Sequence, residues 1–423
     1  MAVYRRTGDM EDETRRDRRK LAREKHLKRV TLAIPLLFFA VLLGFGVYFL
    51  ITHLKSDPAP SSQETLTLDG EPVRLCFVGD VCPSAEAVAA CRKNGGWDFL
   101  PCFQSVMPRL YSADLTVGNL EGVITGDEPT ANAYPPALLR DLHEVGFDLL
   151  QTANSYSISS GLTGLSRTKA EIAAAGMEAV GTCDSQADYD RSRGVVVLDV
   201  GNLRVAFAAF TKGMVNNLQI PEDSAWSVNL LYKDLNYSEI DETRIEQVLD
   251  LAWSWRPDLV VALVHWGSEY NEEISDAQRQ VASLLAKRGV SLVVGTHSHY
   301  VGPIERMANP ASPTGSTVIA YGLGDFFSSA DNENARAGCM LNVSFARSGG
   351  KVVLSGLSYV PTYSAHPDEQ LKSAGWEVFD SLQTVAFYRS QHYARVSEPL
   401  CELLTSQIER MKAQTEAPDL QEP

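Results

Sequence analysis

The sequence predicts an α/β fold with a mixed sheet for the region after residue 72. Short apolar runs alternate there with amphipathic helical segments, the pattern of parallel strands joined by crossover helices. Three late runs, at 316–321, 339–345 and 351–360, read as strands without intervening helices and indicate an antiparallel portion. We therefore expect parallel and antiparallel strands in one protein, with helices packed on the sheets.

The N-terminal part has the pattern of a membrane anchor. Residues 30–51 form an uncharged apolar run of about the 20 residues that cross a bilayer. Residues 1–29 hold eleven Lys or Arg and six acidic residues, which predicts a cytoplasmic tail and an extracytoplasmic domain in a single-pass protein of the cell membrane. A cleaved signal peptide is the alternative, although the apolar run and the tail are both long for one. The lipid bilayer is thus an expected partner.

The remaining elements follow in chain order. Residues 52–71 are a linker, rich in Pro and Ser at 56–63, and the main domain is expected at 72–362. Its predicted helices are 136–146, 166–176, 240–255 and 276–289, and Gly201-Asn202 predicts a hairpin between strands 194–200 and 203–210. Residues 363–423 are expected to be a helical extension, with a helical pattern over 368–412, followed by a disordered tail.

The charge excludes nucleic acid as a simple electrostatic partner. The chain carries a formal charge of −15, and because the tail carries +5, the remaining residues carry about −20. All seven cysteines lie after the predicted anchor. Export permits disulfides, and Cys91–Cys102 or Cys82–Cys102 is the expected local bridge.

Polar side chains follow five of the predicted strands. The strands are 73–78, 114–117, 147–153, 259–264 and 291–294, and the polar residues after them are Asp80, Asn119 with Glu121, Asn154, His265, and His297 with His299. The carboxyl ends of parallel strands open onto one crevice, so these groups are expected to meet. The pattern predicts a metal site with Asp80, Glu121, Asn154, His265, His297 and His299 as ligands.

Each of these residues also has a plainer interpretation. Asp80 or Asn154 can cap a helix, and Asn119 can stabilise a turn. His297 and His299 are expected on the same side of an extended backbone, where both imidazoles face one site, although core or surface histidines remain the alternative. Glu269 is either an acceptor that orients His265 or a solvated acid.

Imidazole, carboxylate and amide ligands suit manganese, iron or zinc, and the site is expected to hold one or two such ions. No Cys or Cys/His spacing typical of a structural zinc finger is present.

These motifs resemble the CapA capsule-synthesis family, whose fold is similar to the calcineurin-like metallophosphoesterases. The matching residues are Asp80, Asn119 to Glu121, Ala153-Asn154, Gly161, His265 to Gly267, Glu269-Tyr270, His297, His299, Tyr321, Leu323, Gly324 and Phe326. The resemblance covers roughly residues 72–362 and implies a four-layer αββα sandwich of two mixed sheets. It also implies substrate contacts at Asn119, Trp266, Tyr321 and Asp325.

The chain departs from the family pattern at four positions. Ser155 stands for an Asn, Tyr156 for a His, Ser159 for an Asp and Asp325 for an Asn. The candidate catalytic residues are therefore Tyr156, at the position of a general acid, and Glu269. A tyrosine titrates near ~10, far from neutral pH, which weakens the case for hydrolysis.

Two functions of different classes follow. The first is a membrane-anchored component in the synthesis, export or anchoring of a capsular polymer such as poly-γ-glutamate, which contacts the anionic polymer or its synthase complex. The second is a metal-dependent, phosphoesterase-like hydrolase at the cell surface.

Overall fold

The computed structural model describes residues 68–125, 130–371, 375–391 and 396–414. These residues fall within one compact unit, Leu66–Pro423. The predicted anchor at 30–51, the basic tail before it and nearly all of the linker lie outside the described residues. Among the residues that are described, no helix combines the length and apolar character that a bilayer span requires.

The first sheet has eight strands, in the order β18-β17-β16-β1-β4-β7-β8, with β15 also paired to β1. Strand β1 runs parallel to β4 and β15 and antiparallel to β16. The strands are β1 (Val73–Cys82), β4 (Leu115–Leu120), β7 (Leu149–Gln151), β8 (Glu178–Val180), β15 (Asp325–Ser328), β16 (Ala337–Ser348), β17 (Lys351–Ala365) and β18 (Glu377–Asp380).

The second sheet has six strands, in the order β13-β14-β12-β11-β10-β9. Its four central strands are parallel, and β9 and β13 pair antiparallel at the edges. The strands are β9 (Val196–Val200), β10 (Leu203–Thr211), β11 (Leu259–His265), β12 (Leu292–Thr296), β13 (Ile304–Ala308) and β14 (Ser316–Ala320). Two small pairs lie outside the main sheets: β2 (Arg92–Lys93) with β3 (Gly96–Trp97), and β5 (Val123–Ile124) with β6 (Ala133–Tyr134).

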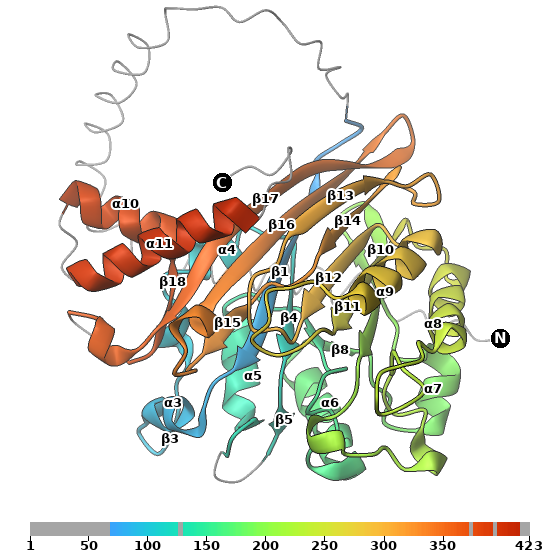
Figure 1. Ribbon diagram of the computed structural model, residues 1–423, viewed down its shortest axis with the longest axis horizontal. Helices are drawn as coiled ribbons and strands as arrows, with labels where there is room; N and C mark the ends of the chain where they lie inside the picture. The colour runs from blue at the N-terminus through green and yellow to red at the C-terminus, as the bar shows by residue number, and fades with distance from the viewer. Residues whose placement is uncertain (1–67, 126–129, 372–374, 392–395, 415–423) are drawn as a thin grey trace, which may run out of the picture. The chain divides into compact units, whose positions relative to one another are not determined.

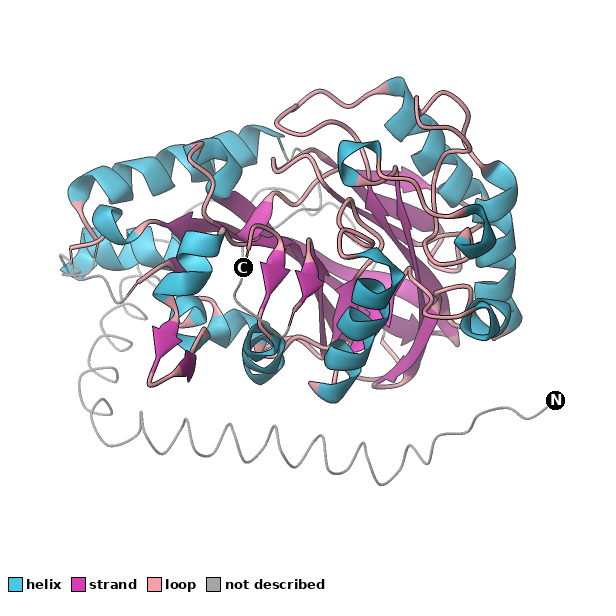
Figure 2. Cartoon of the chain, turned by 90° about the horizontal axis from the view of Figure 1, so that it is seen from below, coloured by secondary structure: helices cyan, strands magenta, loops and turns pink. Residues whose placement is uncertain are grey.

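Helices cover the outer faces of both sheets (Figures 1 and 2). The α-helices are α3 (Ala85–Ala90), α4 (Met107–Leu110), α5 (Pro136–Glu144), α6 (Gly161–Ala174), α7 (Gln186–Ser192), α8 (Glu242–Ser254), α9 (Asp276–Lys287), α10 (Ser381–Gln391) and α11 (Glu398–Gln414). Short 3₁₀ helices are η1 (Leu100–Phe103), η2 (Val215–Asn217), η3 (Glu222–Ser224), η4 (Glu333–Arg336) and η5 (Pro367–Glu369). Helix α9 begins with a capping box between Ser275 and Gln278, which satisfies backbone N–H groups at its first turn.

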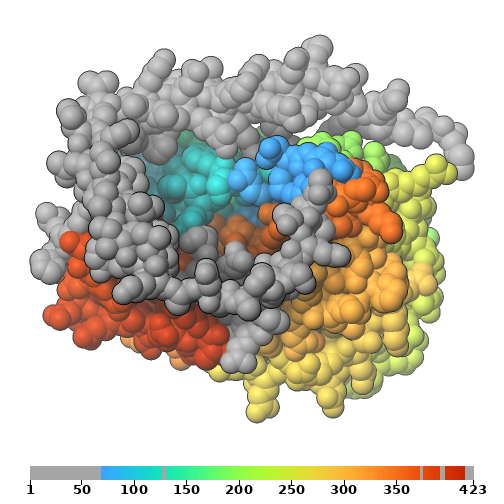
Figure 3. All heavy atoms as spheres, turned by 90° about the horizontal axis from the view of Figure 1, so that it is seen from above, coloured from blue at the N-terminus to red at the C-terminus, as the bar shows by residue number. Residues whose placement is uncertain are grey.

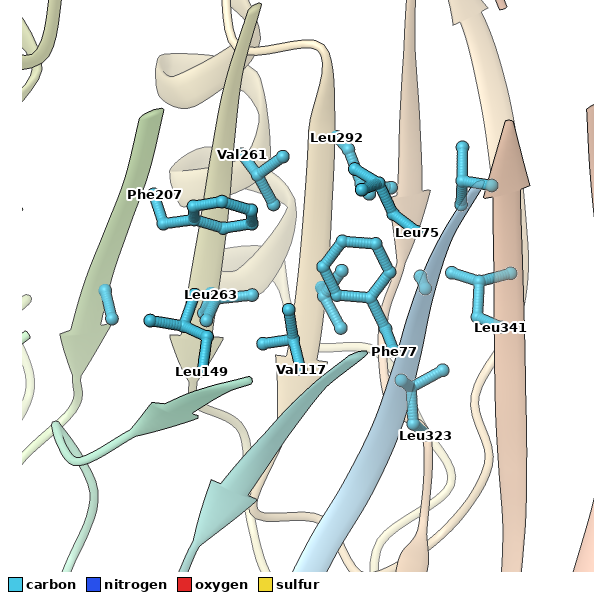
Figure 4. Close-up of a cluster of buried hydrophobic side chains, with 14 of the residues drawn as sticks. Leu75, Phe77, Val117, Leu149, Phe207, Val261, Leu263, Leu292, Leu323 and Leu341 are labelled. Atoms are coloured by element: carbon cyan, nitrogen blue, oxygen red, sulfur yellow. The ribbon is translucent and has the colours of Figure 1, made fainter. Parts of the chain in front are cut away.

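Three apolar clusters define the layers. The first lies between the sheets and contains Phe77, Val117, Phe207, Val261 and Leu292 (Figure 4). The second joins the other face of the first sheet to α3, α4, α5 and α6, and the third joins the other face of the second sheet to α8 and α9. The predicted mixed α/β fold with two sheets is confirmed.

Side-chain alternation assigns residues to these layers. In β11, Leu259, Val261 and Leu263 face the other sheet, whereas Val260, Ala262 and Val264 face the helices. His265 continues the inward series at the end of the strand. The functional residues are therefore expected between the sheets, beyond the end of the apolar core.

The structure corrects the sequence prediction in two places. The helical pattern expected over 368–412 is wrong for Glu377–Asp380, which forms β18 and pairs with β17. Helix α6 begins at Gly161, five residues before the predicted start. Helices α10 and α11 pack on Tyr363 and Phe379 in a fourth apolar cluster. Figure 3 shows these helices in red, on the opposite side of the visible face from the yellow residues of the middle of the chain. The predicted 201–202 hairpin is confirmed as β9 and β10.

Candidate metal centre

A bulge in β1 turns Asp80 toward the space between the sheets. Phe77 pairs with Val117 and Asp80 pairs with Asn119, so β1 has one more residue than β4 over this stretch. The extra residue reverses the phase of the strand, so that Val81 packs toward the helices and Asp80 points inward. The bulge depends on Gly79, because a Cβ there would lie 1.8 Å from the carbonyl oxygen of Gly324.

The first sheet also contributes Asn119, Glu121 and Asn154. Asn119 Nδ2 donates to Asp80 Oδ1 at 2.7 Å, and Asn154 Nδ2 donates to Asn119 Oδ1 at 3.1 Å. Asn154 Oδ1 accepts from the backbone N–H of Tyr156 at 3.0 Å. Asn154 thus fixes the loop after β7 and orients Asn119, and its role as a metal ligand stays a prediction. Leu120 packs toward the helices, which leaves Asn119 and Glu121 on the inner face as predicted.

The second sheet contributes three histidines from β11 and the loop after β12. His265 Nδ1 lies 3.0 Å from Thr296 Oγ1, and the His265 and His297 rings are 4.5 Å apart between centroids. His297 and His299 both have positive φ, at 88° and 58°, so the extended backbone predicted for this pair is wrong. Such strain in non-glycine residues is typical of functional sites. The backbone N–H of His297 donates to Asp80 Oδ2 at 3.1 Å, which ties this loop to β1.

Three sets of metal-binding atoms meet here, each set within 4.8 Å. They are Glu121 with His265 and His297, Asp80 with His299 and Asp325, and Cys82 with Glu121 and His299. The first and third sets share Glu121, and the second and third share His299. We call these seven residues the donor cluster.

The polar atoms of the donor cluster fit a bound cation. Both carboxylate oxygens of Glu121, 1% exposed, and Nδ1 of His297, 4% exposed, are buried without a hydrogen-bond partner. Buried polar atoms are rarely left without a partner, because desolvation then costs about 1–3 kcal/mol each. Glu121, His265 and His297 follow three different strands, and their donor atoms lie within 4.8 Å of one another. This arrangement is typical of a metal site.

Electrostatics support the same interpretation. Burial, together with Asp325, raises the pKa of Glu121 to about 7, against the opposing effect of His299. Burial and the Glu121 carboxylate raise the pKa of Asp80 well above its usual value. Burial lowers the pKa of both His265 and His297, with added repulsion from nearby cationic groups, so both imidazoles are neutral and able to bind a metal.

His299 differs from the other two histidines. Its Nδ1 lies 2.8 Å from Asp325 Oδ1 and 3.7 Å from Asp80 Oδ2. Burial disfavours the imidazolium, but Asp325 and Glu121 outweigh this effect and raise the pKa of His299 well above its usual value. Asp325, 1% exposed, orients His299 through this contact, and its expected role as a substrate contact stays a prediction.

Two of the predicted substrate contacts lie away from the donor atoms. Trp266 and Tyr321 are buried on the helix side of the second sheet, where their rings stack at 5.8 Å and Trp266 Nε1 donates to the Tyr321 carbonyl. Alternation along β11 sends Trp266 to the face opposite His265, and the substrate contacts expected for Trp266 and Tyr321 stay predictions. Glu269 is exposed, and His265 Nδ1 contacts Thr296 Oγ1.

Tyr156 and Ser155 follow Asn154 at the edge of the donor cluster. Ser155 Oγ lies 3.1 Å from His265 Nε2. Burial and the Glu121 carboxylate raise the pKa of Tyr156 to about 12, which makes it a poorer acid at neutral pH than an exposed tyrosine. Over the donor cluster, Tyr270 stacks on His299 at 5.2 Å. The expected crevice is therefore closed over the donor atoms. Even His299, which lies under Tyr270, is only 9% exposed.

Sequence reasoning missed Cys82 and Thr296. Cys82 lies two residues after Asp80, and this period-2 spacing is the signal that places both on one strand face. None of the seven cysteines forms a disulfide in the structure, and Cys91 Sγ and Cys102 Sγ lie 3.6 Å apart. Of the two expected bridges, only Cys91–Cys102 has its sulfur atoms in contact.

The region that holds the donor cluster matches a family of bacterial capsule-synthesis proteins. Residues 74–330 match the family model of the bacterial capsule synthesis protein PGA_cap, and the chain belongs to this family.

Two relatives each match 73% of the chain. The PGA biosynthesis protein CapA of Bacillus subtilis (strain 168) is 25% identical over 320 residues, which are 73% of this chain and 74% of that protein. The capsule biosynthesis protein CapA of Bacillus anthracis is 23% identical over 316 residues, 73% of this chain and 70% of that protein. Among solved structures, the calcineurin-like phosphoesterase YfkN from Bacillus subtilis is 11% identical with a TM-score of 0.40, over 81% of this chain and 98% of that one.

Proposed function

We propose that this chain is a membrane-anchored, extracytoplasmic component of capsular polyglutamate synthesis or export, and that its donor cluster binds one or two divalent metal ions. Family membership supports the biological role. The apolar run at 30–51, with the basic tail before it, supports the single-pass topology with a cytoplasmic N-terminus.

The metal proposal rests on one observation. Glu121 and His297 present three buried polar atoms without hydrogen-bond partners, within reach of the neutral imidazole of His265. Glu121, His265 and His297 would hold one ion, and Asp80, His299 and Asp325 a second. Manganese, iron or zinc suits these ligands. A bound ion would supply positive charge that polarises a carboxyl or phosphoryl oxygen.

The surrounding residues hold the ligands in place. Thr296 contacts His265 Nδ1 and fixes the ring, whose Nε2 lies 3.1 Å from Ser155 Oγ and 3.3 Å from Glu121 Oε1. Asn119 orients Asp80 by its 2.7 Å hydrogen bond. Asp325 does the same for His299. These contacts keep the donor atoms in position before any ion arrives.

Positive charge at this site matters for an anionic polymer. The chain after the basic tail carries about −20, which repels polyglutamate. An ion in the donor cluster would offset this repulsion locally. Lys212 adds a nearby cation: its Nζ donates to the Gly267 carbonyl at 2.6 Å, beside the strand end that carries His265.

A hydrolase is the second candidate, favoured by the adjacency of the donor sets. Sets that share Glu121 and His299 resemble the arrangement in which two ions clamp one phosphoryl group. The raised pKa of Tyr156 argues against efficient proton donation to a leaving group. We therefore favour a metal-dependent binding function over a hydrolase.

The test is genetic and biochemical. In the native host, deletion of this chain should reduce surface polyglutamate. Re-expression of the wild type should restore it, and the double variant His265→Ala/His297→Ala should not, although it reaches the membrane at the same level. Full restoration by the double variant would refute a role for the donor cluster. Turnover of a generic phosphodiester by purified wild-type protein, absent in the double variant, would favour the hydrolase.

A further inference from the structure

Cys82 differs from the other cysteines of the chain. It is the only one that is partly exposed, whereas the other six are buried. The bulge that turns Asp80 inward also turns Cys82 inward, because the two residues are separated by one position on β1. The thiol comes within 4.8 Å of donor atoms of Glu121 and His299.

A second observation points to a ligand at this position. The Glu121 carboxylate has both oxygens buried and without a hydrogen-bond partner, at 1% exposure. It belongs to two sets of donor atoms, one with His265 and His297 and one with Cys82 and His299. A carboxylate that belongs to two such sets has one oxygen for each. An ion bound to His265 and His297 therefore leaves the Glu121 oxygen nearer Cys82 without a partner.

We propose that Cys82 is a thiolate ligand of the second ion, the one held by His299 with Asp80 and Asp325, and that the second oxygen of Glu121 also contacts this ion. This inference rests on the proposed metal-binding function and specifies the chemistry of one half of that site. The metal–sulfur bond forms as the thiol proton leaves to solvent, and no oxidation is involved. A site with sulfur, nitrogen and oxygen ligands favours zinc or iron(II) over manganese, because thiolate is a soft ligand.

Cobalt(II) tests this directly, because cobalt bound to thiolate gives a sulfur-to-metal charge-transfer band in the near ultraviolet. The full chain, purified in detergent and stripped of metal with a chelator, is titrated with cobalt(II). We expect the band in the wild type and its loss in Cys82→Ser and Cys82→Ala. The control variant Cys91→Ala should keep the band, since the Cys91 thiol contacts Cys102 at 3.6 Å and belongs to none of the donor sets.

The variants should still bind metal through the remaining ligands. We expect zinc affinity at the Cys82 site to fall by at least about 10–100-fold, the range seen when groups that support a metal ligand are removed. Both variants should retain cobalt at His265 and His297, measured as bound metal per chain.

A second measurement uses only the wild type. Iodoacetamide should alkylate Cys82 before the six buried cysteines in metal-free protein, and zinc should slow this reaction by about tenfold or more, because a metal-bound thiolate is withdrawn from attack. Peptide mass mapping identifies the labelled residue.

The outcomes separate the two proposals. A wild type that binds no cobalt or zinc overturns both. A wild type that binds cobalt without a charge-transfer band, with equal alkylation of Cys82 in the presence and absence of zinc, overturns the role of Cys82 alone and leaves metal binding intact.

Discussion

Replacing Glu121 with glutamine should have opposite effects on stability in the absence and presence of metal. In metal-free protein, burial holds the pKa of this carboxyl at about 7, against an ordinary value of 4.5. Ionising it in the folded state therefore costs about 3 kcal/mol at pH 8, at 1.36 kcal/mol per pKa unit. Glu121→Gln removes this cost while keeping the shape of the side chain.

The pH dependence has a definite sign. As pH rises from about 4.5 to about 7, the unfolded state loses its proton first, so the stability of the metal-free wild type falls across that window and then levels off. The variant lacks this contribution. We expect the two proteins to be similarly stable near pH 4.5, and the variant to be more stable by up to about 3 kcal/mol at pH 8.

Metal should reverse the order. At a free zinc concentration of about a thousand times the Kd, binding stabilises the wild type by about 4 kcal/mol. The variant, having lost a charged ligand, gains much less. For a folded unit of roughly 350 residues, 3 kcal/mol corresponds to a Tm difference of about 4 °C, from an unfolding entropy of about 2.1 cal/mol/K per residue.

The assay is thermal unfolding of the full chain in detergent, at pH 4.5 and pH 8, with chelator or with zinc. Glu121→Asp is a matched control, because it keeps the charge and shortens the side chain. The reasoning is refuted if Glu121→Gln is no more stable than the wild type at pH 8 in chelator, or if zinc stabilises both proteins equally.

Three further predictions concern other residues. The double variant Tyr156→His/Ser155→Asn should raise any phosphodiesterase activity of metal-loaded protein, because an imidazole with a pKa near ~6.5 replaces a phenol with a pKa of about 12. If metal-loaded protein gains no activity, the site binds its ligand without hydrolysing it. Under oxidising conditions Cys91 and Cys102 should form a disulfide that stabilises the fold by about 3 kcal/mol, because it lowers the entropy of the unfolded chain. A count of seven free thiols after oxidation would contradict this. Trp266→Phe should lower stability by about 1–3 kcal/mol through the lost buried hydrogen bond and leave zinc affinity unchanged, so a large loss of affinity would restore Trp266 to the site.

The convergence of the site was predictable because it follows from strand periodicity. His265 continues the inward series of β11, and Asn119 and Glu121 continue that of β4, so the apolar pattern already assigns them to the inner face. The parallel order of the central strands then brings these ends together. Both facts depend only on local pattern and on the α/β alternation.

The parts that could not be predicted depend on departures from periodicity. The β1 bulge reverses the phase of Asp80 and Cys82, and nothing in the residues before it marks an insertion, apart from Gly79. The pairing of β15 with β1 is equally non-local, because Asp325 follows Asp80 by 245 positions in the chain. His297 reaches the site through a positive φ rather than through an extended strand.

The central claim is that the donor cluster binds a divalent ion, and metal analysis of the full chain tests it most directly. Wild-type protein purified without chelator should carry about one or two ions of zinc, iron or manganese per chain. His265→Ala/His297→Ala should lose one of them while keeping the metal-free Tm within a few degrees. A wild type that carries no metal, and whose Tm does not respond to added zinc or manganese, would contradict the account.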